Sequence, residues 1–176
     1  MSELTSLAQA GRHRFRDATD WFVMTSHEGF TTTKVGASSE RVVDLWHALS
    51  AYLDPAVDVR LHDVRTARTW TGSLLALPDV RETMGRLRLP LSAYGGVELT
   101  VGTGNDQLSL TPEMLLVIYA RTDRWGFLLD GLGLVEREVP PRPTWIPSRS
   151  TLRPESQLEQ ALQTAAERLG LAEVTV

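Results

Sequence analysis

A short polar segment in the first half of the chain carries the side chains best suited to chemistry. Asp58, Arg60 and His62 occupy alternate positions, and Asp63 follows directly. If the segment is a strand, the first three side chains share one face. A carboxylate beside an imidazole can set its tautomer and poise it as a base near neutral pH, so His62 with Asp58 or Asp63 is a candidate acid/base group. The alternative is a solvated strand face with ordinary cross-strand pairs.

No pattern in the sequence indicates a metal or a cofactor. The chain has no cysteine, and the spacing of its four histidines matches no zinc or calcium motif. The glycine-containing segment 102–106 is followed by alternating residues rather than by a helix, which favours a hairpin turn over a phosphate loop. We therefore predict neither a metal site nor a cofactor site.

Two pairs of arginine and tryptophan are the candidates for contact with another protein. Arg68 lies close to Trp70, and Arg124 is next to Trp125. Both tryptophans fall beside predicted turns, so we expect them to be partly exposed. Aromatic side chains and arginine are enriched at the energetic centres of protein interfaces. The alternative is packing within the monomer, with each guanidinium over a tryptophan ring.

The composition limits the class of protein. A net charge of −4 gives no general attraction to nucleic acid or to anionic lipid. The longest apolar run, residues 114–120, is far shorter than the ~20 residues that cross a bilayer. We therefore expect a cytoplasmic protein with neither nucleic acid nor membrane as partner. Arginine outnumbers lysine 17 to 1, which is typical of a GC-rich genome, so we expect a bacterial source.

The spacing of apolar residues predicts strands and helices along most of the chain. Leucine and tryptophan recur every three or four positions after Ser38, and alternation marks residues 57–62 as a strand. The expected strands are a hairpin over 19–35, then 57–62, 69–77, 97–101, 107–110, 114–120 and 127–136. The expected helices cover 2–10, 38–53, 78–90 and 154–169, with Gly170 ending the last.

Residues 112–125 can be interpreted in two ways. Thr111, Pro112 and Glu113 are typical of a helix start, but residues 115–119 are apolar on every side and include β-branched residues. We favour a central strand, because a helix that is apolar all round must be wholly enclosed. A helix over 111–123, with the end of a second helix and then a wing over 128–137, would instead indicate a winged-helix DNA-binding protein.

These elements predict an α+β fold, a largely antiparallel sheet with about three helices packed on it in the order β-β-α-β-β-α-β-β-β-α. We expect a single domain: a body over residues 1–139, a proline-rich connector over 140–153, and a C-terminal helix and tail over 154–176 that pack on the body.

Three functional hypotheses follow. The first is a non-catalytic bacterial binding or assembly module, a homo-oligomer or adaptor that uses the tryptophan and arginine pairs and an exposed sheet edge, with a protein partner or self-association. The second is a small-molecule binder or acid/base enzyme that uses His62. The third is a winged-helix DNA-binding protein. We favour the first, because no nucleophile, metal or nucleotide motif is present.

Overall fold

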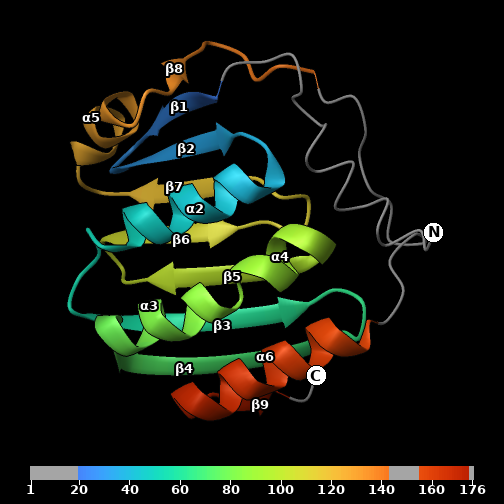
Figure 1. The fold of residues 1–176 in the computed structure, drawn as a ribbon. Helices are drawn as coiled ribbons and strands as arrows, with labels where there is room; N and C mark the ends of the chain where they lie inside the picture. The colour runs from blue at the N-terminus through green and yellow to red at the C-terminus, as the bar shows by residue number, and fades with distance from the viewer. Residues whose placement is uncertain (1–19, 143–154, 175–176) are drawn as a thin grey trace.

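The computed structural model describes residues 20–142 and 155–174, which form an open sheet with helices on one face (Figure 1). The nine strands lie in the order β8-β1-β2-β7-β6-β5-β3-β4-β9. All neighbouring strands are antiparallel except β1 and β8, which are parallel. Their bounds are β1 Trp21–His27, β2 Phe30–Gly36, β3 Ala56–Asp63, β4 Arg68–Ala76, β5 Val97–Gly102, β6 Asp106–Leu110, β7 Leu116–Ala120, β8 Val135–Glu136 and β9 Ala172–Val174.

The described helices cover the face of the sheet that is turned toward the viewer in Figure 1. Helices α2, α3, α4 and α6 lie across its centre and lower part, and α5 lies at the end near β8. Their bounds are α2 Ser39–Ser50, α3 Leu77–Arg86, α4 Arg88–Tyr94, α5 Arg124–Gly131 and α6 Ser156–Leu169.

The core lies between this face of the sheet and the helices, and strand alternation explains it. In β3, Val57, Val59 and Leu61 are at most 2% exposed and point toward the helices. The residues between them point to the other face. From the helix side, α2 buries an apolar stripe against the sheet that includes Trp46 and Leu49. Burial of these side chains on both layers supplies the main stabilisation of the fold.

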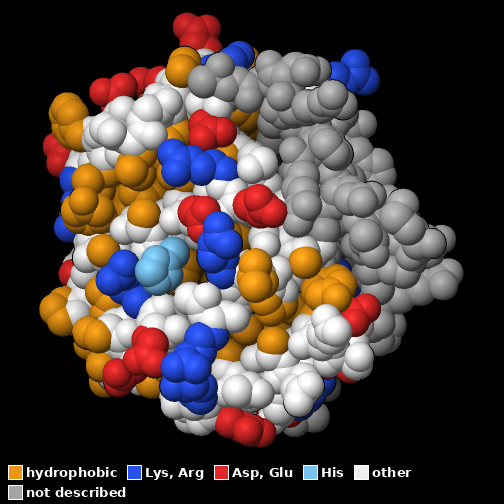
Figure 2. Space-filling model, in the orientation of Figure 1, with side chains coloured by type: hydrophobic (Ala, Val, Ile, Leu, Met, Phe, Trp, Pro, Cys, Tyr) orange, Lys and Arg blue, Asp and Glu red, His pale blue; other side chains and the backbone are white. Residues whose placement is uncertain are grey.

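The outer surface of the helix layer mixes acidic and basic side chains (Figure 2). Apolar side chains gather over α5, at the upper left of that view. This helix exposes Phe127 by 81% while burying Trp125 and Leu129 against the core. The intermixed charges give this face no large region of a single sign.

Several sequence-based predictions are confirmed. The hairpin expected over 19–35 is β1 and β2, joined at a turn where Gly29 has a φ of 83°. The segment expected to return onto residues 57–62 is β4, which pairs antiparallel with β3. The favoured strand in the ambiguous segment is β7, at the centre of the sheet between β2 and β6.

The number and order of helices differ from the prediction, since the described residues hold five helices rather than about three. The strand expected over 127–136 is helix α5 followed by the two-residue β8. The helix expected over 78–90 is divided into α3 and α4. Pro90 does not end a helix but lies in the first turn of α4, where its missing N–H costs nothing.

One of the two helical segments in the winged-helix hypothesis is a strand. That hypothesis placed a helix over residues 111–123, but Leu116–Ala120 is a strand and the helix begins only at Arg124. The segment 128–137, which that hypothesis interprets as the end of a helix followed by a wing, does contain the end of α5, followed by the two-residue β8.

Two predictions fall largely outside the described residues, namely the helix over 2–10 and the proline-rich connector, of which only residues 140–142 are described. The last helix is confirmed as α6, and Gly170 ends it with a φ of 63°. None of the described helices combines the length and hydropathy that are needed to cross a bilayer.

Candidate functional site

The second face of the sheet, which we call the open face, carries most of the polar strand residues. The described helices bury their apolar side chains in the core on the opposite face. The strand register places Arg60 of β3 between Thr71 of β4 and Thr100 of β5, and it places His62 between Thr69 and Glu98. The prediction that Asp58, Arg60 and His62 share one face agrees with this alternation.

A hollow of about 530 Å³ lies on the open face over β3 to β6. Its lining residues are Asp58, Val59, Arg60, Thr71, Gly72, Ser73, Glu98, Thr100, Gly102, Thr103, Gly104 and Gln107. These residues supply two carboxylates, one guanidinium, several hydroxyls and glycine backbone that a ligand can approach closely. The lining of the hollow therefore offers hydrogen-bond donors and acceptors close to one another.

A bulge in β4 forms part of this hollow and fixes the position of Asp58. The register between β3 and β4 shifts between Val57 and Val59. In the bulge, Leu74 has a φ of 55° and is 83% exposed. Its backbone N–H donates to Oδ1 of Asp58 at 3.0 Å. One carboxylate oxygen of Asp58 thus holds the bulge, and Oδ2 makes no hydrogen bond to the described residues.

Arg60 pairs across the strands with Glu98, a residue that the sequence did not indicate. Its Nη1 lies 3.3 Å from Oε2 of Glu98, and the two side chains are 47% and 34% exposed. A pair this exposed contributes about 0 to 1 kcal/mol to folding. The pair can therefore open toward a ligand at little cost in stability.

His62 has a hydroxyl as its described partner rather than a carboxylate. Its Nδ1 lies 2.8 Å from Oγ1 of Thr69. Asp58 is four residues away along the strand, or about 13 Å. Asp63 is 1% exposed and points to the opposite face. The structure therefore does not bring His62 together with either of its candidate partners.

Asp63 has a structural role instead, in the turn that follows β3. Its Oδ1 accepts a hydrogen bond from the backbone N–H of Arg65 at 3.0 Å, and its Oδ2 accepts one from the hydroxyl of Thr66 at 2.8 Å. This is the arrangement in which an aspartate shapes a turn by binding the backbone two residues on. Asp63 holds the turn between β3 and β4.

A second hollow, of about 540 Å³, adjoins the first and contains two aromatic side chains. It is lined by Glu28, Gly29, Phe30, Thr103, Gly104, Asn105, Gln107, Tyr119, Ala120 and Arg121, so the two hollows share residues 103, 104 and 107. Phe30 and Tyr119 are 40% and 44% exposed. His27 is opposite Phe30 in the pairing of β1 with β2, and its ring stacks on Phe30 with centroids 4.6 Å apart, which extends the aromatic group.

Sequence analysis missed this aromatic end. Tyr119 lies in a run that is apolar throughout, so alternation gave no sign of which residue faces solvent. Phe30 and Tyr119 become diagonal neighbours only through the pairing of β2 with β7, in which Thr32 is opposite Tyr119. The one available signal was Phe30 directly after a hairpin turn.

The first tryptophan and arginine pair is packed into the molecule, so the expected exposure of Trp70 is wrong. Trp70 is 3% exposed, and the guanidinium of Arg68 lies 4.6 Å from its ring centroid. Arg68 also donates to Glu173 and to Gln163, each at 2.8 Å. The hydrogen bond from Arg68 holds the pKa of Glu173 below its usual value. The pair attaches α6 and β9 to β4.

The second pair is also internal. Trp125 is 1% exposed, and Arg124 lies 5.2 Å from its ring centroid. The guanidinium of Arg124 donates to Oδ2 of Asp106 at 2.7 Å, and Asp106 is only 3% exposed. Burial alone raises the pKa of the Asp106 carboxyl, but hydrogen bonds from Thr122 and Arg124 outweigh burial and hold that pKa below its usual value. Whether either pair serves as an interface stays a prediction.

The fold and the site define a class of protein in general terms: an α+β protein with one face of its sheet covered by helices and a polar, partly aromatic opposite face. Comparison with known proteins adds no name to this class, because no family model, no curated protein and no solved structure matches the chain. Among the described residues, no group of three or more histidine and carboxylate side chains is placed to hold a metal ion.

Proposed function

We propose that the protein is a non-catalytic binding module that holds a segment of a partner polypeptide on the open face of its sheet. The observation that carries this proposal is the continuity of the two hollows. They share Thr103, Gly104 and Gln107 and together run from the aromatic pair Phe30 and Tyr119 to the charged side chains near Arg60.

The lining supports a polypeptide ligand better than a small apolar one. Pockets for small molecules are mostly apolar with a few placed polar groups, whereas the hollow around Arg60 is lined mainly by charged, hydroxyl and amide groups. A polypeptide segment supplies donors and acceptors at every residue and can carry both signs of charge. Exposed aromatic rings at the other end provide the anchor that protein interfaces commonly use.

The surroundings of His62 favour binding over acid/base chemistry. A general base needs a neighbouring group that orients it and stabilises its charged form. The described partner of His62 is the hydroxyl of Thr69, and Glu98 is paired with Arg60. We therefore assign His62 to the rim of the binding surface rather than to a reaction.

The test is site-specific photo-crosslinking in cells that naturally make the protein. A photoreactive phenylalanine analogue replaces Tyr119 at the centre of the aromatic end. In the control, the same analogue replaces Leu89, which is 70% exposed and lies on α4. Mass spectrometry then identifies the adducts. A second sample carries Arg60→Glu, which places a carboxylate diagonally across from that of Glu98 and leaves the core untouched.

The proposal predicts a discrete adduct from position 119 that position 89 does not form. Arg60→Glu should reduce this adduct at least about tenfold, since an acidic side chain of the partner that pairs with Arg60 would then meet a like charge, which costs several kcal/mol. An adduct of twice the chain mass identifies a second copy as the partner. Identical adducts from both positions, or an adduct unchanged by Arg60→Glu, would refute the proposal.

A further inference from the structure

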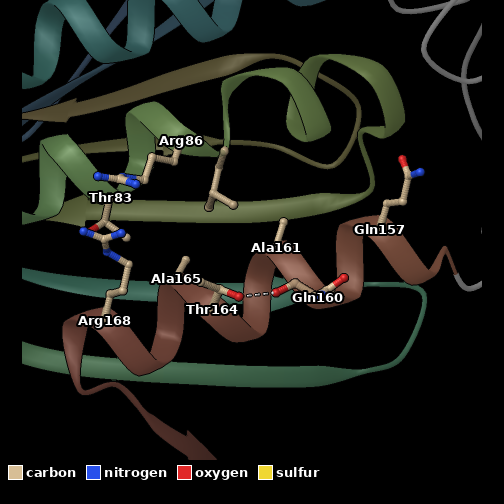
Figure 3. A pocket seen from close by; sticks show the side chains of 9 residues that line it. Thr83, Arg86, Gln157, Gln160, Ala161, Thr164, Ala165 and Arg168 are labelled. Carbon is tan, nitrogen blue, oxygen red and sulfur yellow. Dashed lines mark hydrogen bonds between the residues drawn. The ribbon is translucent and has the colours of Figure 1, made fainter.

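A hollow of about 330 Å³ lies between α3 and α6 on the helix side of the sheet (Figure 3). Its floor already belongs to the core, since Leu87 and Ala165 are 2% and 3% exposed. Glu82 lies 2.9 Å from Arg86 and 3.5 Å from Arg168, so these charges are paired within the chain. The outer edge of β1 offers more to another molecule, because backbone groups there have no partner among the described residues.

Strand β8 covers only the first part of that edge. It pairs with two residues at the start of β1. The backbone oxygens of Asp20 and Phe22 accept hydrogen bonds from the N–H groups of Val135 and Arg137, both at 2.9 Å. The backbone groups of Asp20 and Phe22 therefore point outward from the sheet.

The next outward groups of β1 belong to Met24 and Ser26, because successive residues of a strand direct their N–H and C=O groups to opposite sides. Within residues 20–142 and 155–174, no strand or loop pairs with these two N–H and two C=O groups, which we call the free edge. The side chains of Thr25, Ser26 and His27 are exposed, and Met24 is half-buried. A further strand therefore has access to this part of β1.

The free edge is regular and carries no fixed charge. All seven residues of β1 pair with β2 without a register shift. Residues 23–27 include neither proline nor aspartate, glutamate, lysine or arginine, the residues that protect many natural sheet edges. The other end of the sheet is protected, since β9 covers residues 69–71 of β4 and the bulge at Leu74 bends the remainder. The edge of β1 is thus the better suited of the two to pair with an added strand.

An added strand would meet different surroundings on its two sides. On the helix side, α5 lies against β1, because a Cβ on Gly126 would be 3.2 Å from Sδ of Met24. The next residue of α5, Phe127, is 81% exposed, and apolar side chains gather over this helix (Figure 2). On the open face the neighbour is the hydroxyl of Thr25. Residues opposite Met24 and Ser26 direct their side chains to the helix side, so apolar residues fit at these alternate positions.

We propose that the free edge binds an extended segment of a partner polypeptide as an added strand, in which apolar side chains alternate with polar ones. The backbone of the segment supplies the hydrogen bonds, and its apolar side chains lie beside Met24 and Phe127. A second copy of β1 fits less well, because it would turn the polar side chain of Ser26 toward α5. This mode of binding does not rest on the open-face proposal, since it uses backbone groups at the edge of the sheet rather than side chains on its face.

The test uses the full chain and a synthetic peptide. The peptide is capped, about seven residues long, and alternates valine with threonine between terminal lysines. The control peptide is N-methylated at every valine, the residues whose N–H groups face the free edge. In NMR titrations, the unmodified peptide should shift the amide signals of Met24 and Ser26. The N-methylated peptide should bind at least about tenfold more weakly, because its donors are lost.

Substitutions at the edge separate backbone from side-chain effects. Ser26→Pro removes an outward N–H group and leaves the hydrogen bonds between β1 and β2 in place, so the chain should fold but bind the peptide at least about tenfold more weakly. Ser26→Ala is the matched control, since it keeps the N–H group and should bind as the native chain does. Phe127→Ser should weaken binding about threefold or more, because it removes apolar surface beside the added strand.

Hydrogen exchange tests the free edge without any variant or peptide. The outward amides of Met24 and Ser26 should exchange on the order of a hundredfold faster than the amide of Thr25, which points toward β2.

Any of four results overturns the proposal: slow exchange of both outward amides, which would show that another part of the chain covers them; no amide shift at about 1 mM peptide; equal affinity for the two peptides; or equal weakening by Ser26→Pro and Ser26→Ala. Arg60→Glu alters only the open face and should leave the peptide affinity unchanged. Loss of binding in that variant would overturn the proposal and assign the peptide to the open face instead.

Discussion

Replacing the buried carboxylate of Asp106 should reveal how the chain positions α5. Oδ1 of Asp106 accepts from the backbone N–H groups of Arg121 and Thr122, at 3.2 Å and 3.4 Å. Oδ2 accepts from the hydroxyl of Thr122 and from Nη2 of Arg124, both at 2.7 Å. The turn from β7 into α5 is thus hydrogen-bonded to the first residue of β6.

Asp106→Asn keeps the size of the side chain and removes one of these four hydrogen bonds. The amide oxygen can still accept from both backbone N–H groups, and the hydroxyl of Thr122 can rotate to accept from the new NH₂ group. The bond from Arg124 cannot form, because donor would face donor. A hydrogen bond to a charged group contributes about 1.5 to 3 kcal/mol, so we expect a loss of about 2 to 3 kcal/mol in the free energy of unfolding.

Urea denaturation and calorimetry measure this loss. In a chain of this size it lowers Tm by roughly 5 to 10 °C. Asp123→Asn is the matched control, since Asp123 is exposed and makes no side-chain cap bond at the start of α5; it should change stability by less than about 0.5 kcal/mol.

The effect should also depend on pH. Because the folded pKa of Asp106 is below its ordinary value of 3.8, the unfolded chain takes up a proton first as the pH falls. The stabilisation is complete above the unfolded pKa and is lost as the pH falls through the folded one. The difference between the native chain and Asp106→Asn should therefore shrink in acid below about pH 4. Equal stability of Asp106→Asn and Asp123→Asn at pH 7, or a difference that is constant down to pH 2, would refute this account of Asp106.

Two backbone positions give further predictions. Gly36→Ala should lower the free energy of unfolding by about 1 to 3 kcal/mol in urea denaturation, because a Cβ there would meet the ring of Trp21 at 2.2 Å. Gly104→Ala is the control: nothing lies within 4 Å of its Cβ, so it should change the free energy of unfolding by less than about 0.5 kcal/mol. Equal effects of the two substitutions would contradict the reasoning. Leu74→Asn should raise the free energy of unfolding by about 0.5 kcal/mol, seen as a slightly higher Tm, because asparagine tolerates a positive φ better than leucine. This gain in stability should disappear when Asp58→Ala also removes the hydrogen bond to the bulge.

Local patterns were enough to predict much of the fold. Alternation placed Asp58, Arg60 and His62 on one face of a strand, and the three-and-four spacing from Val42 to Leu49 identified α2. Both patterns arise from the periods of the elements themselves, 2.0 and 3.6 residues. Such periods can be read from a single segment without knowledge of its neighbours.

Helix α5 was missed because its signal was short and its neighbours were misleading. Residues 127–134 are mostly apolar, which is equally typical of a strand. Trp125 and Leu129, four residues apart, are the buried pair that indicates the helix. Residues at the start of this region donate hydrogen bonds to Asp106, which lies on the neighbouring strand β6. No local pattern in the sequence could have indicated these bonds.

The candidate site depended still more on long-range pairing. Glu98 meets Arg60, and Tyr119 comes next to Gln107, only because β5 pairs with β3 and β7 pairs with β6. The partners are distant in sequence, and strand register is set by the whole hydrophobic pattern rather than by single residues. The two tryptophans show the converse: their neighbours in the sequence indicated turns, but packing of α5 and α6 buried them.

The strands at the two ends of the sheet bear on how the protein behaves at high concentration. An exposed long strand offers a row of unpaired N–H and C=O groups and can template aggregation. Here β8 has two residues and β9 has three, and each contains a glutamate. Deleting β9 would uncover β4, whose nine residues include Trp70. These two short strands therefore limit edge-to-edge pairing of one chain with the next, and a chain that lacks β9 should precipitate at a lower concentration than the full chain.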